Sequence, residues 1–412
     1  MTIPTLTSHV LPKEMKPDIV VMGGGPIGLW TAIQTKMRTG KEVVVLEKYQ
    51  NYMRSDIRLN IDASSFDGAA KDAELNALIK GWSAAPIPIK TLEESLAKRA
   101  HELGIQTIKG YKAEPSALPK LFPSAKIFIG ADGARSAVRH EIFGDAMKFD
   151  TKLQYMAQVH YTVKPPKNDL VQDDPYFRRI KDGIRSYSMQ KFAGHFIVQN
   201  THPQEDGSLK ISLNIFIDKT TYEQTIDATF KNPYYFEQDL AKTPSTLKEL
   251  LIKWWGAKKL FYDEEISLEE PGLNKLTVVA LNSYAAQEVV KVTENGKTWA
   301  LVGDAAQAHP FFRAVNNGFL LGSRLATSLK NDTTSSLQSY NRYATIRAYI
   351  ERVRAVAKSV FISLYSLYLK IISKLPWRGA IQLGQAQEDR CYRQGLILWK
   401  KIEKLAPTPV FV

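Results

Sequence analysis

One stretch near the N-terminus decides the fold. It reads DIVVM at 18–22, GGGPIG at 23–28 and, after a helical segment, EVVVLE at 42–47. Short apolar runs of this kind are typical of buried strands in a parallel sheet. We predict a strand over the first run, a helix over 29–38 that ends at Gly40, and a second strand over 42–46.

The glycines between the first strand and the helix have the spacing G-x-G-x-x-G. Gly23 permits the tight turn, Gly25 lets the backbone approach a pyrophosphate, and Gly28 lets the helix pack against the strand. Phosphates bind favourably at a helix N-terminus because its first N–H groups have no partner within the helix. Pro26 stands at that N-terminus, and we include it among the candidate cofactor-binding residues.

Glu47 lies at the end of the second strand, 19 residues after Gly28. A carboxylate in this position accepts hydrogen bonds from the ribose hydroxyls of a dinucleotide. The neighbouring Lys48 is a further candidate for cofactor binding. The order strand, turn, helix, strand and acid predicts dinucleotide binding rather than an ordinary glycine turn, and it suits NAD and FAD equally.

Two later segments distinguish the cofactors. KIFIG at 126–130 leads into ADGARSAVR at 131–139, and TWALV at 298–302 leads into GDAA at 303–306. With the first motif, they resemble the class A flavoprotein monooxygenases, which share G-x-G-x-x-G, D-G-x-x-S-x-x-R and G-D-A-A in this order. The resemblance implies an α/β fold with a Rossmann-like FAD-binding domain, FAD as cofactor and NAD(P)H as reductant.

The resemblance also implies roles for individual residues. Gly303 and Asp304 would bind the ribityl chain of FAD, and the following helix would direct its N-terminus at the flavin. Asp132 and Arg139 would lie on the route shared by FAD and the nicotinamide cofactor. Asp132 with its following glycine is equally a good turn after a strand, so that alternative stays open.

Other candidates rest on narrower matches. Lys90 stands where the family has an arginine at the start of a helix, and Arg54 matches an arginine near the flavin. Both are equally well explained as surface residues. The run from Tyr284 to Glu288 resembles the MICAL monooxygenase domain, which makes Tyr284 a candidate for the substrate pocket. Pro310 and Asn317 belong to a segment similar to that of kynurenine 3-monooxygenase, and we assign them to cofactor binding.

The segment after the G-D-A-A motif departs from the family. Residues 312–315 read FRAV where the family has a G-x-G turn, and Gln307 replaces a histidine. Glycines there let the backbone lie close to the flavin ring. Arg313 would either place a positive charge near the reduced flavin or obstruct the ring. We therefore carry two hypotheses: an FAD-dependent monooxygenase that uses NAD(P)H and O2, with Arg313 and Tyr284 as catalytic candidates, and a flavin-binding scaffold in which FAD is structural.

The middle of the chain has a different pattern. Apolar and polar residues alternate over 155–163, 195–200 and 209–217, which predicts an antiparallel sheet. The segment 222–260 is expected to be helical and to cover that sheet. We expect an FAD-binding domain over 17–148 and 277–330, a substrate domain over 149–276 and a C-terminal helical region over 331–412. No histidine has metal-ligand spacing, so no metal site is expected.

The charge is concentrated at the C-terminal end. The 412 residues carry a net charge of +13, and residues 339–412 contain 13 Lys and Arg against 4 Asp and Glu, a net of +9. Arg342, Arg347, Arg352 and Arg354 are expected on one face of a helix. Such a helix would lie on an anionic membrane or an acidic partner, or it would cap the FAD domain with a solvated basic face. No nucleic-acid module is present.

Cellular location follows from weaker signals. The N-terminal residues have no secretory pattern, and the single cysteine, Cys391, excludes an intrachain disulfide. The apolar run 359–373 is shorter than the roughly 20 residues that a spanning helix needs. We expect a cytoplasmic protein that can associate with a membrane through its tail.

Overall fold

The computed structural model describes residues 15–50, 58–164, 175–268, 272, 274–310, 313–331, 334–374 and 385–404. The chain forms two compact units, Met1–Thr151 with Asn282–Ala355 and Lys152–Leu281 with Val356–Val412. Three elements contribute residues to both units: β7 (Met147–Val163), β11 (Lys275–Ala286) and α10 (Thr334–Ile372). The segment that we expected to form a separate C-terminal helical region is thus divided between the two units.

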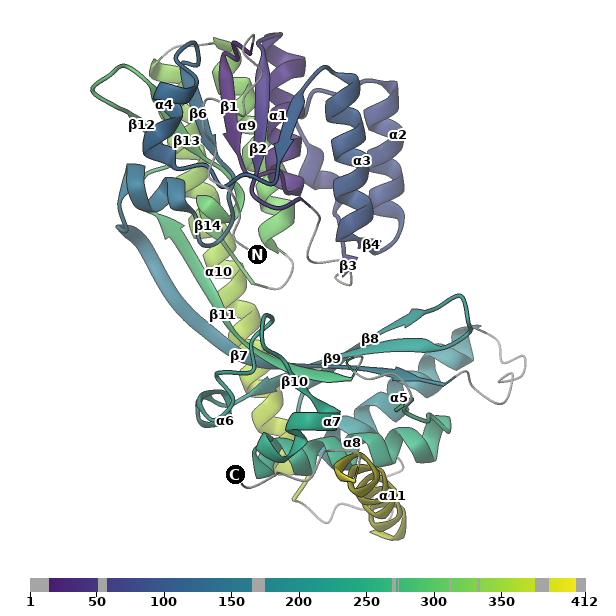
Figure 1. The fold of residues 1–412 in the computed structure, drawn as a ribbon. Helices are drawn as coiled ribbons and strands as arrows, with labels where there is room; N and C mark the ends of the chain where they lie inside the picture. The colour runs from purple at the N-terminus through teal and green to yellow at the C-terminus, as the bar shows by residue number, and fades with distance from the viewer. Residues whose placement is uncertain are drawn as a thin grey trace, which may run out of the picture. The chain divides into compact units, whose positions relative to one another are not determined.

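The first unit is built on a six-stranded sheet with the order β12-β13-β6-β1-β2-β5 (Figure 1). All neighbours are parallel except the edge pair of β12 and β13. The strands are β1 (Ile19–Met22), β2 (Val43–Glu47), β5 (Gln106–Lys109), β6 (Ile127–Gly130), β12 (Val290–Val292) and β13 (Thr298–Leu301). The two strands predicted from the apolar runs near the N-terminus are confirmed, since β1 and β2 lie within one residue of the expected positions.

Helix α1 (Pro26–Thr39) connects β1 with β2 and packs against α9 (Arg313–Asn331) and α3 (Ile89–Glu102). Proline is favoured at the first position of a helix, and Gly40 ends α1 in a left-handed conformation with φ of 68°. Gly318 and Gly322 allow the close approach of α9, because a Cβ on either would lie within 2.7 Å of an α1 side chain. The predicted helix is therefore confirmed.

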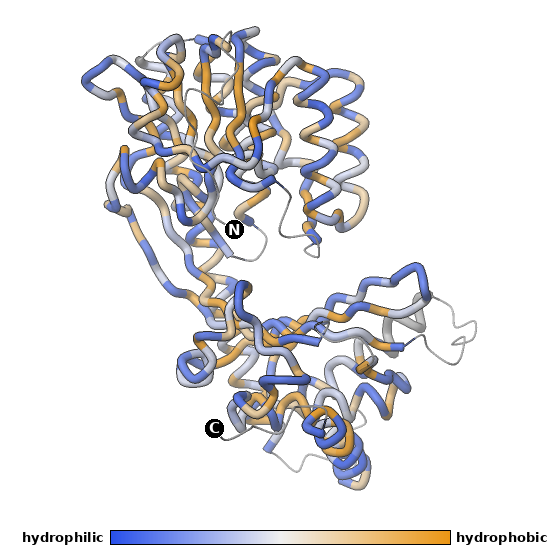
Figure 2. The backbone as a smooth tube through the Cα atoms, in the orientation of Figure 1, coloured by the Kyte–Doolittle hydropathy of each residue, from blue (hydrophilic) through white to orange (hydrophobic). Residues whose placement is uncertain are grey.

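Smaller elements complete the first unit. They are β3 (Arg58–Leu59), α2 (Ala73–Ala84), β4 (Ile87–Pro88), α4 (Leu118–Leu121), β14 (Gln307–Ala308), a π-helical turn over Arg139–Phe143 and short 3-10 turns over Ala63–Phe66, Pro115–Ala117 and Gly303–Ala305. Figure 2 shows the hydrophobic residues concentrated on the central strands of the unit's sheet. Because β1, β2 and β6 are buried along their length, the core of the unit lies around these strands.

The second unit contains an antiparallel sheet with the order β10-β11-β7-β9-β8. Its remaining strands are β8 (Ile197–Pro203), β9 (Leu209–Ile217) and β10 (Tyr234–Tyr235). Strand β9 pairs with β7 over its full length and with β8 from Leu209 to Ile215. The antiparallel sheet expected from residue alternation is confirmed.

The hydrophobic core of this unit includes residues of the sheet and of helices. The helices of the unit are α5 (Pro175–Ala193), α6 (Lys219–Glu223), α7 (Phe236–Asp239), α8 (Ser245–Tyr262) and α11 (Gln385–Glu403), and a 3-10 turn lies over Leu240–Lys242. The expectation of one helical segment over 222–260 is wrong, because only the part from Ser245 forms a long helix. Pro233 and Pro244 disfavour helical conformation in the residues before them, and β10 and α7 lie between.

Helices α8 and α11 cross at two glycines. A Cβ on Gly256 would lie 1.8 Å from the carbonyl oxygen of Cys391, and a Cβ on Gly395 would lie 1.8 Å from that of Ile252. Trp255 and Trp399 stack beside the crossing, with ring centroids 6.1 Å apart. This contact fixes α11 as part of the second unit's core.

Candidate functional site

The glycine-rich turn contains glycines with two different roles. Gly23 has a φ of 112°, and a Cβ there would lie 2.3 Å from the carbonyl oxygen of Ala131. A Cβ on Gly28 would lie 1.8 Å from the carbonyl oxygen of Gly23. Gly25 differs, because no atom of the described residues lies within 4 Å of its Cβ position although it is the N-cap of α1. Folding requires the first two glycines, whereas Gly25 leaves open space beside a helix N-terminus.

Glu47 lies beside this turn. Its Oε2 accepts a hydrogen bond of 2.7 Å from the backbone N–H of Gly24, and its Oε1 accepts one of 2.9 Å from that of Tyr49. A carboxylate has about four acceptor positions, so both oxygens keep capacity for further donors. The acid is therefore fixed at the end of β2, next to the open space at Gly25, as the sequence predicted.

Glu93 on α3 is a site residue that the sequence reasoning missed. Burial, together with the negative charge of Glu47, raises the pKa of Glu93 to about 7. Its Oε2 has no hydrogen-bond partner among the described residues. Lys90, on the same helix, is exposed and lies 3.8 Å from Glu94. The charged group of α3 that faces Glu47 is thus an acid, and no sequence signal distinguished it from its neighbours.

Asp132 holds the turn that follows β6. Its carboxylate accepts hydrogen bonds from the hydroxyl of Ser136 at 2.5 Å and from the backbone N–H of Ala137 at 2.6 Å. Asp132 therefore performs the turn-forming role that the sequence left open beside cofactor binding.

Arg139 and Tyr284 meet at the backbone of the Gly303–Asp304 turn. The Tyr284 hydroxyl donates to the carbonyl oxygen of Asp304 at 2.7 Å, and the Arg139 guanidinium donates to those of Asp304 and Ala305 at 3.3 and 3.0 Å. Burial, with the charge of Asp304, raises the pKa of Tyr284. Tyr284 is hence a neutral phenol that, with Arg139, fixes the position of Asp304.

The N-terminus of α9 is held by a cluster of charges around Glu351 of α10. Arg313 donates to both carboxylate oxygens of Glu351, at 2.8 and 2.9 Å, and to Asp62 at 3.1 Å. Arg347 and Arg354 each lie 2.9 Å from Glu351, whose side chain is fully buried. Burial alone would raise the pKa of Glu351, but the hydrogen bond and charges of the arginines lower it.

This cluster corrects the prediction of one solvated basic face. Arg347 and Arg354 turn toward Glu351, Arg352 lies over the ring of Phe149 at 4.5 Å, and Arg342 is exposed. The four arginines do not share one solvent-exposed face, because the carboxylate of Glu351 attracts Arg347 and Arg354, which lie four and three residues from it.

Two asparagines connect α9 to its surroundings. Asn316, which no sequence signal selected, accepts from the backbone N–H of Asp62 and the hydroxyl of Ser65 and donates to the carbonyl of Asn60. Asn317 accepts from Arg347 at 3.2 Å. Both are buried, and Asn317 contributes to positioning α9 in this structure.

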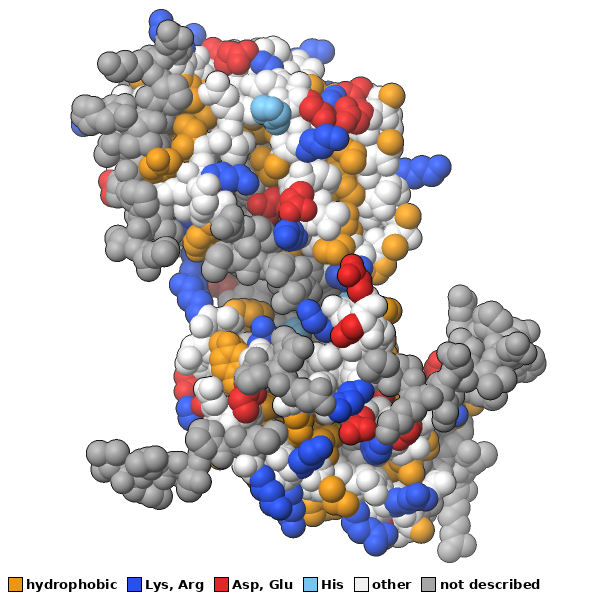
Figure 3. Space-filling model, turned by 45° about the vertical axis from the view of Figure 1, so that its right-hand side comes forward, with side chains coloured by type: hydrophobic (Ala, Val, Ile, Leu, Met, Phe, Trp, Pro, Cys, Tyr) orange, Lys and Arg blue, Asp and Glu red, His pale blue; other side chains and the backbone are white. Residues whose placement is uncertain are grey.

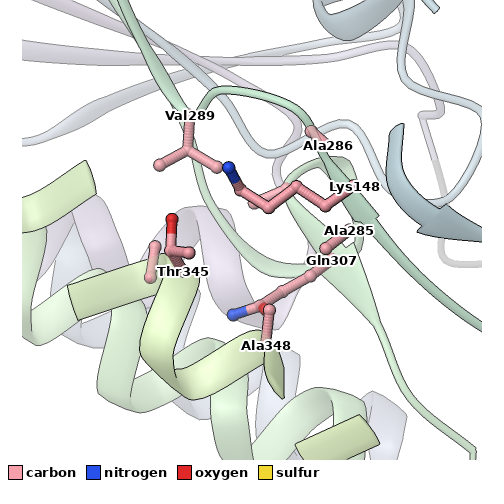
Figure 4. Close-up of a pocket in the computed structure, with 9 residues that line it drawn as sticks. Lys148, Ala285, Ala286, Val289, Gln307, Thr345 and Ala348 are labelled. Carbon is pink, nitrogen blue, oxygen red and sulfur yellow. The ribbon is translucent and has the colours of Figure 1, made fainter. Parts of the chain in front are cut away.

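Gln307 and His309 are buried next to this segment. Neither amide atom of Gln307 nor Nε2 of His309 has a hydrogen-bond partner among the described residues. His309 Nδ1 lies 3.0 Å from the Ser283 hydroxyl, and burial lowers the pKa of this histidine to about 4. Gln307 lines a small cavity together with Lys148 and Thr345 (Figure 4). The volume of this cavity is about 10 Å³, which suits one water molecule.

The remaining candidates are placed as follows. Gly303 has a φ of 59°, and its Cβ position lies 3.0 Å from Ile27 at the start of α1, so the two motifs adjoin. Pro310 is buried, whereas Lys48 is exposed over the ring of Tyr49. Arg54 lies outside the described residues. Within those residues, no cluster of His, Cys, Asp or Glu could hold a metal ion.

No model of a known protein family matches the chain, and no curated protein matches it. Several solved structures match nearly its whole length. The flavin-dependent halogenase CmlS has a TM-score of 0.55 at 11% identity, over 93% of this chain and 70% of the halogenase. AlpK has a TM-score of 0.53 at 18% identity, over 93% of this chain and 77% of AlpK.

A third structure is aklavinone-11 hydroxylase, solved in a complex with FAD and aklavinone. Its TM-score is 0.52 at 15% identity, over 91% of this chain and 73% of the hydroxylase. At these identities the likeness establishes the fold. It confirms the predicted architecture of a Rossmann-like domain with an inserted antiparallel sheet.

Proposed function

We propose that this chain is an FAD-dependent oxidoreductase that uses NAD(P)H and O2 to hydroxylate or oxidise an organic substrate. The observation that carries the proposal is the open space at Gly25 beside the N-terminus of α1, with Glu47 adjacent. The fold shared with flavin enzymes supports FAD as the ligand. Bound FAD would supply the redox chemistry, taking electrons from NAD(P)H and passing them to O2.

The protein's own residues would bind and orient the cofactor. The N-terminus of α1 would receive the pyrophosphate, because its N–H groups and dipole favour anions. Glu47 would accept the ribose hydroxyls with its remaining acceptor positions. Asp304 would bind the ribityl chain from a turn that Tyr284 and Arg139 hold in place. We assign Tyr284 and Arg313 to positioning, since each has its polar atoms engaged with other residues of the chain.

A flavin-binding scaffold is the second candidate. One observation favours it: the segment that in related enzymes is a glycine turn beside the flavin here begins α9 with Arg313 fixed by two carboxylates. An ion-paired N-terminus of this kind would restrict the approach of the flavin ring. In such a protein FAD would bind at Gly25 but would not exchange electrons with NAD(P)H.

Anaerobic mixing of the FAD-reconstituted chain with NADPH or NADH distinguishes the two functions. The oxidoreductase is expected to lose its flavin absorbance and to regain it on admission of air. Acceleration of NAD(P)H consumption by a panel of aromatic metabolites and methionine peptides would then identify the substrate class. Retention of the flavin absorbance with both reductants, with and without that panel, would reject the oxidoreductase and support the scaffold.

A further inference from the structure

The C-terminal half of α10 exposes large apolar side chains within the second unit. Leu364 is 62% exposed, Phe361 61%, Leu367 54%, Ile371 52%, Val360 51% and Tyr368 43%. We call these six residues the exposed stripe. Scattered apolar residues are normal on protein surfaces, but a contiguous set along one helix marks an interaction site.

The spacing of the exposed stripe shows that it is one face of the helix. Val360, Leu364, Leu367 and Ile371 follow one another at intervals of four, three and four residues. Phe361 and Tyr368 lie beside this line and widen it. The same spacing continues toward the N-terminus of α10, where Ile346, Ile350 and Val353 are exposed in the first unit. Within the second unit, the apolar face is therefore wider than a two-position seam.

The opposite face of this helix packs against its own unit. Ile362 and Leu369 are buried, and Ser359 donates to the carbonyl of Leu153 at 3.0 Å. Tyr365 packs edge-on against Phe196 with centroids 5.4 Å apart. By length and composition alone, the helix over Ser335–Ile372 could cross a bilayer, since an 18-residue window within it has a mean hydropathy of 1.5. Because one face is already packed, only the other can meet lipid, and the helix would lie in the plane of the membrane surface.

The charges around the exposed stripe are positive. Between Asn341 and Lys374 the only acid is Glu351, and it is fully buried. Within the second unit the exposed cations of this stretch are Lys358, Lys370 and Lys374, and Arg354, which precedes them in the first unit, is paired with Glu351. Lys and Arg are also frequent on the face of the second unit that Figure 3 shows. Cations beside an apolar helix face complement anionic lipid headgroups.

A second copy of the chain fits this face less well. Paired helices with this spacing are specified by opposite charges at the positions flanking the seam. Those positions hold Arg354 and Lys370 with uncharged residues and include no exposed acid. Two such faces would bring like charges together, whereas an anionic bilayer would accept both the cations and the apolar side chains.

We propose that the exposed stripe docks the protein peripherally on a membrane rich in anionic lipid. The apolar side chains enter the boundary between headgroups and acyl chains, and the flanking cations contact the headgroups. The inference is independent of the proposed oxidoreductase activity, because it rests on α10 and not on the glycine-rich turn.

Sedimentation of the full chain with vesicles tests the proposal. The probes are vesicles of phosphatidylcholine and of phosphatidylcholine mixed with phosphatidylglycerol. We expect stronger pelleting with the anionic vesicles, weakened at high salt because ions screen the cations. The variant Leu364→Ser/Leu367→Ser is expected to bind the anionic vesicles about 100-fold more weakly, at roughly tenfold for each leucine.

The matched control is Ile226→Ser/Phe230→Ser, which removes apolar side chains that are 55% and 62% exposed in the same unit. This control should pellet like the wild type. Equal pelleting of the leucine variant and the wild type would overturn the proposal, as would a wild type that stays in the supernatant with both vesicles. Thermal unfolding establishes that each variant is folded, and Leu364→Ser alone replaces the double variant if it is not.

Light scattering without vesicles tests whether a second copy of the chain covers the exposed stripe. The proposal expects a monomer for the wild type and for the leucine variant. A wild-type dimer that dissociates on Leu364→Ser/Leu367→Ser would assign the stripe to an interface between copies and overturn membrane docking.

Discussion

The N-termini of α1 and α9 lie in the same unit but are built in opposite ways. The start of α1 is open, because nothing in the described part of the chain lies within 4 Å of the Cβ position of Gly25. The start of α9 is closed, because Arg313 is fixed between Glu351 and Asp62. Unsatisfied N–H groups at an open helix end favour an anion, whereas the side chain at the start of α9 is already paired with two carboxylates. We therefore assign ligand binding to α1 and positioning to α9.

Substitution of a turn glycine that folding requires should cause the greatest loss of stability. Gly28→Ala places a Cβ 1.8 Å from the backbone oxygen of Gly23, so the helix must move away from the strand. We expect the free energy of unfolding to fall by at least about 3 kcal/mol. Urea denaturation measures it. Gly81→Ala on α2 is the control, since its Cβ would meet no described atom within 4 Å, and it should be stabilising by about 0.5 kcal/mol or more.

The ion cluster at α9 should give the next effect. Glu351→Gln leaves three arginines without their shared carboxylate, and we expect a loss of about 3 kcal/mol in the free energy of unfolding. Glu403→Gln is the matched control, because its ion pair with Lys248 is partly exposed and should contribute less than about 1 kcal/mol. Equal losses in the two variants would show that the cluster does not position α9.

Gly25→Val makes the start of α1 resemble that of α9, because it closes the open helix end without a clash. Its φ of −71° is accessible to any residue, and the side chain has space. We expect an unchanged thermal midpoint but FAD binding weaker by about 100-fold, since the side chain occupies the position of the pyrophosphate. Isothermal titration with FAD measures the affinity. If the variant binds FAD as tightly as the wild type does, the pyrophosphate of FAD does not bind at this helix end.

The weakest change concerns Glu93. Its pKa is raised to about 7 by burial and the charge of Glu47, so the folded chain binds more protons than the unfolded chain between about pH 4.5 and 7. Stability from this group is therefore lost as pH rises through that window. Glu93→Gln should raise the free energy of unfolding at pH 8 by about 1 kcal/mol, after allowance for partial exposure, and leave it unchanged near pH 4. A pH series of urea denaturations checks both values.

Local sequence signals predicted the open helix end but not the closed one. The apolar runs, the turn glycines and Glu47 lie within 30 residues, so their spacing determines their arrangement. The closed end depends on contacts between distant segments. Glu351 is 38 residues from Arg313, and Asp62 is 251 residues from it. No periodicity identifies such partners, although the spacing of Arg347 and Glu351 by four residues could have indicated a pair.

The same reason explains which contacts of the candidate site the sequence did not predict. Tyr284 and Asp132 were selected for chemistry, but each has its polar group engaged with nearby backbone. Glu93 was missed because its burial follows from the packing of α3, which the sequence of that helix does not reveal. A motif thus indicated where the candidate site lies, and the tertiary contacts show which residues of it are engaged with the rest of the chain.

The decisive experiment is to measure the flavin content of the purified chain after incubation with FAD. We expect one equivalent of tightly bound FAD, visible as flavin absorbance that stays with the protein through gel filtration. We also expect that Gly25→Val, folded to the same thermal midpoint, elutes without that absorbance. A wild-type chain that elutes colourless would contradict the assignment of FAD to the start of α1, and so would a Gly25→Val variant that retains the flavin.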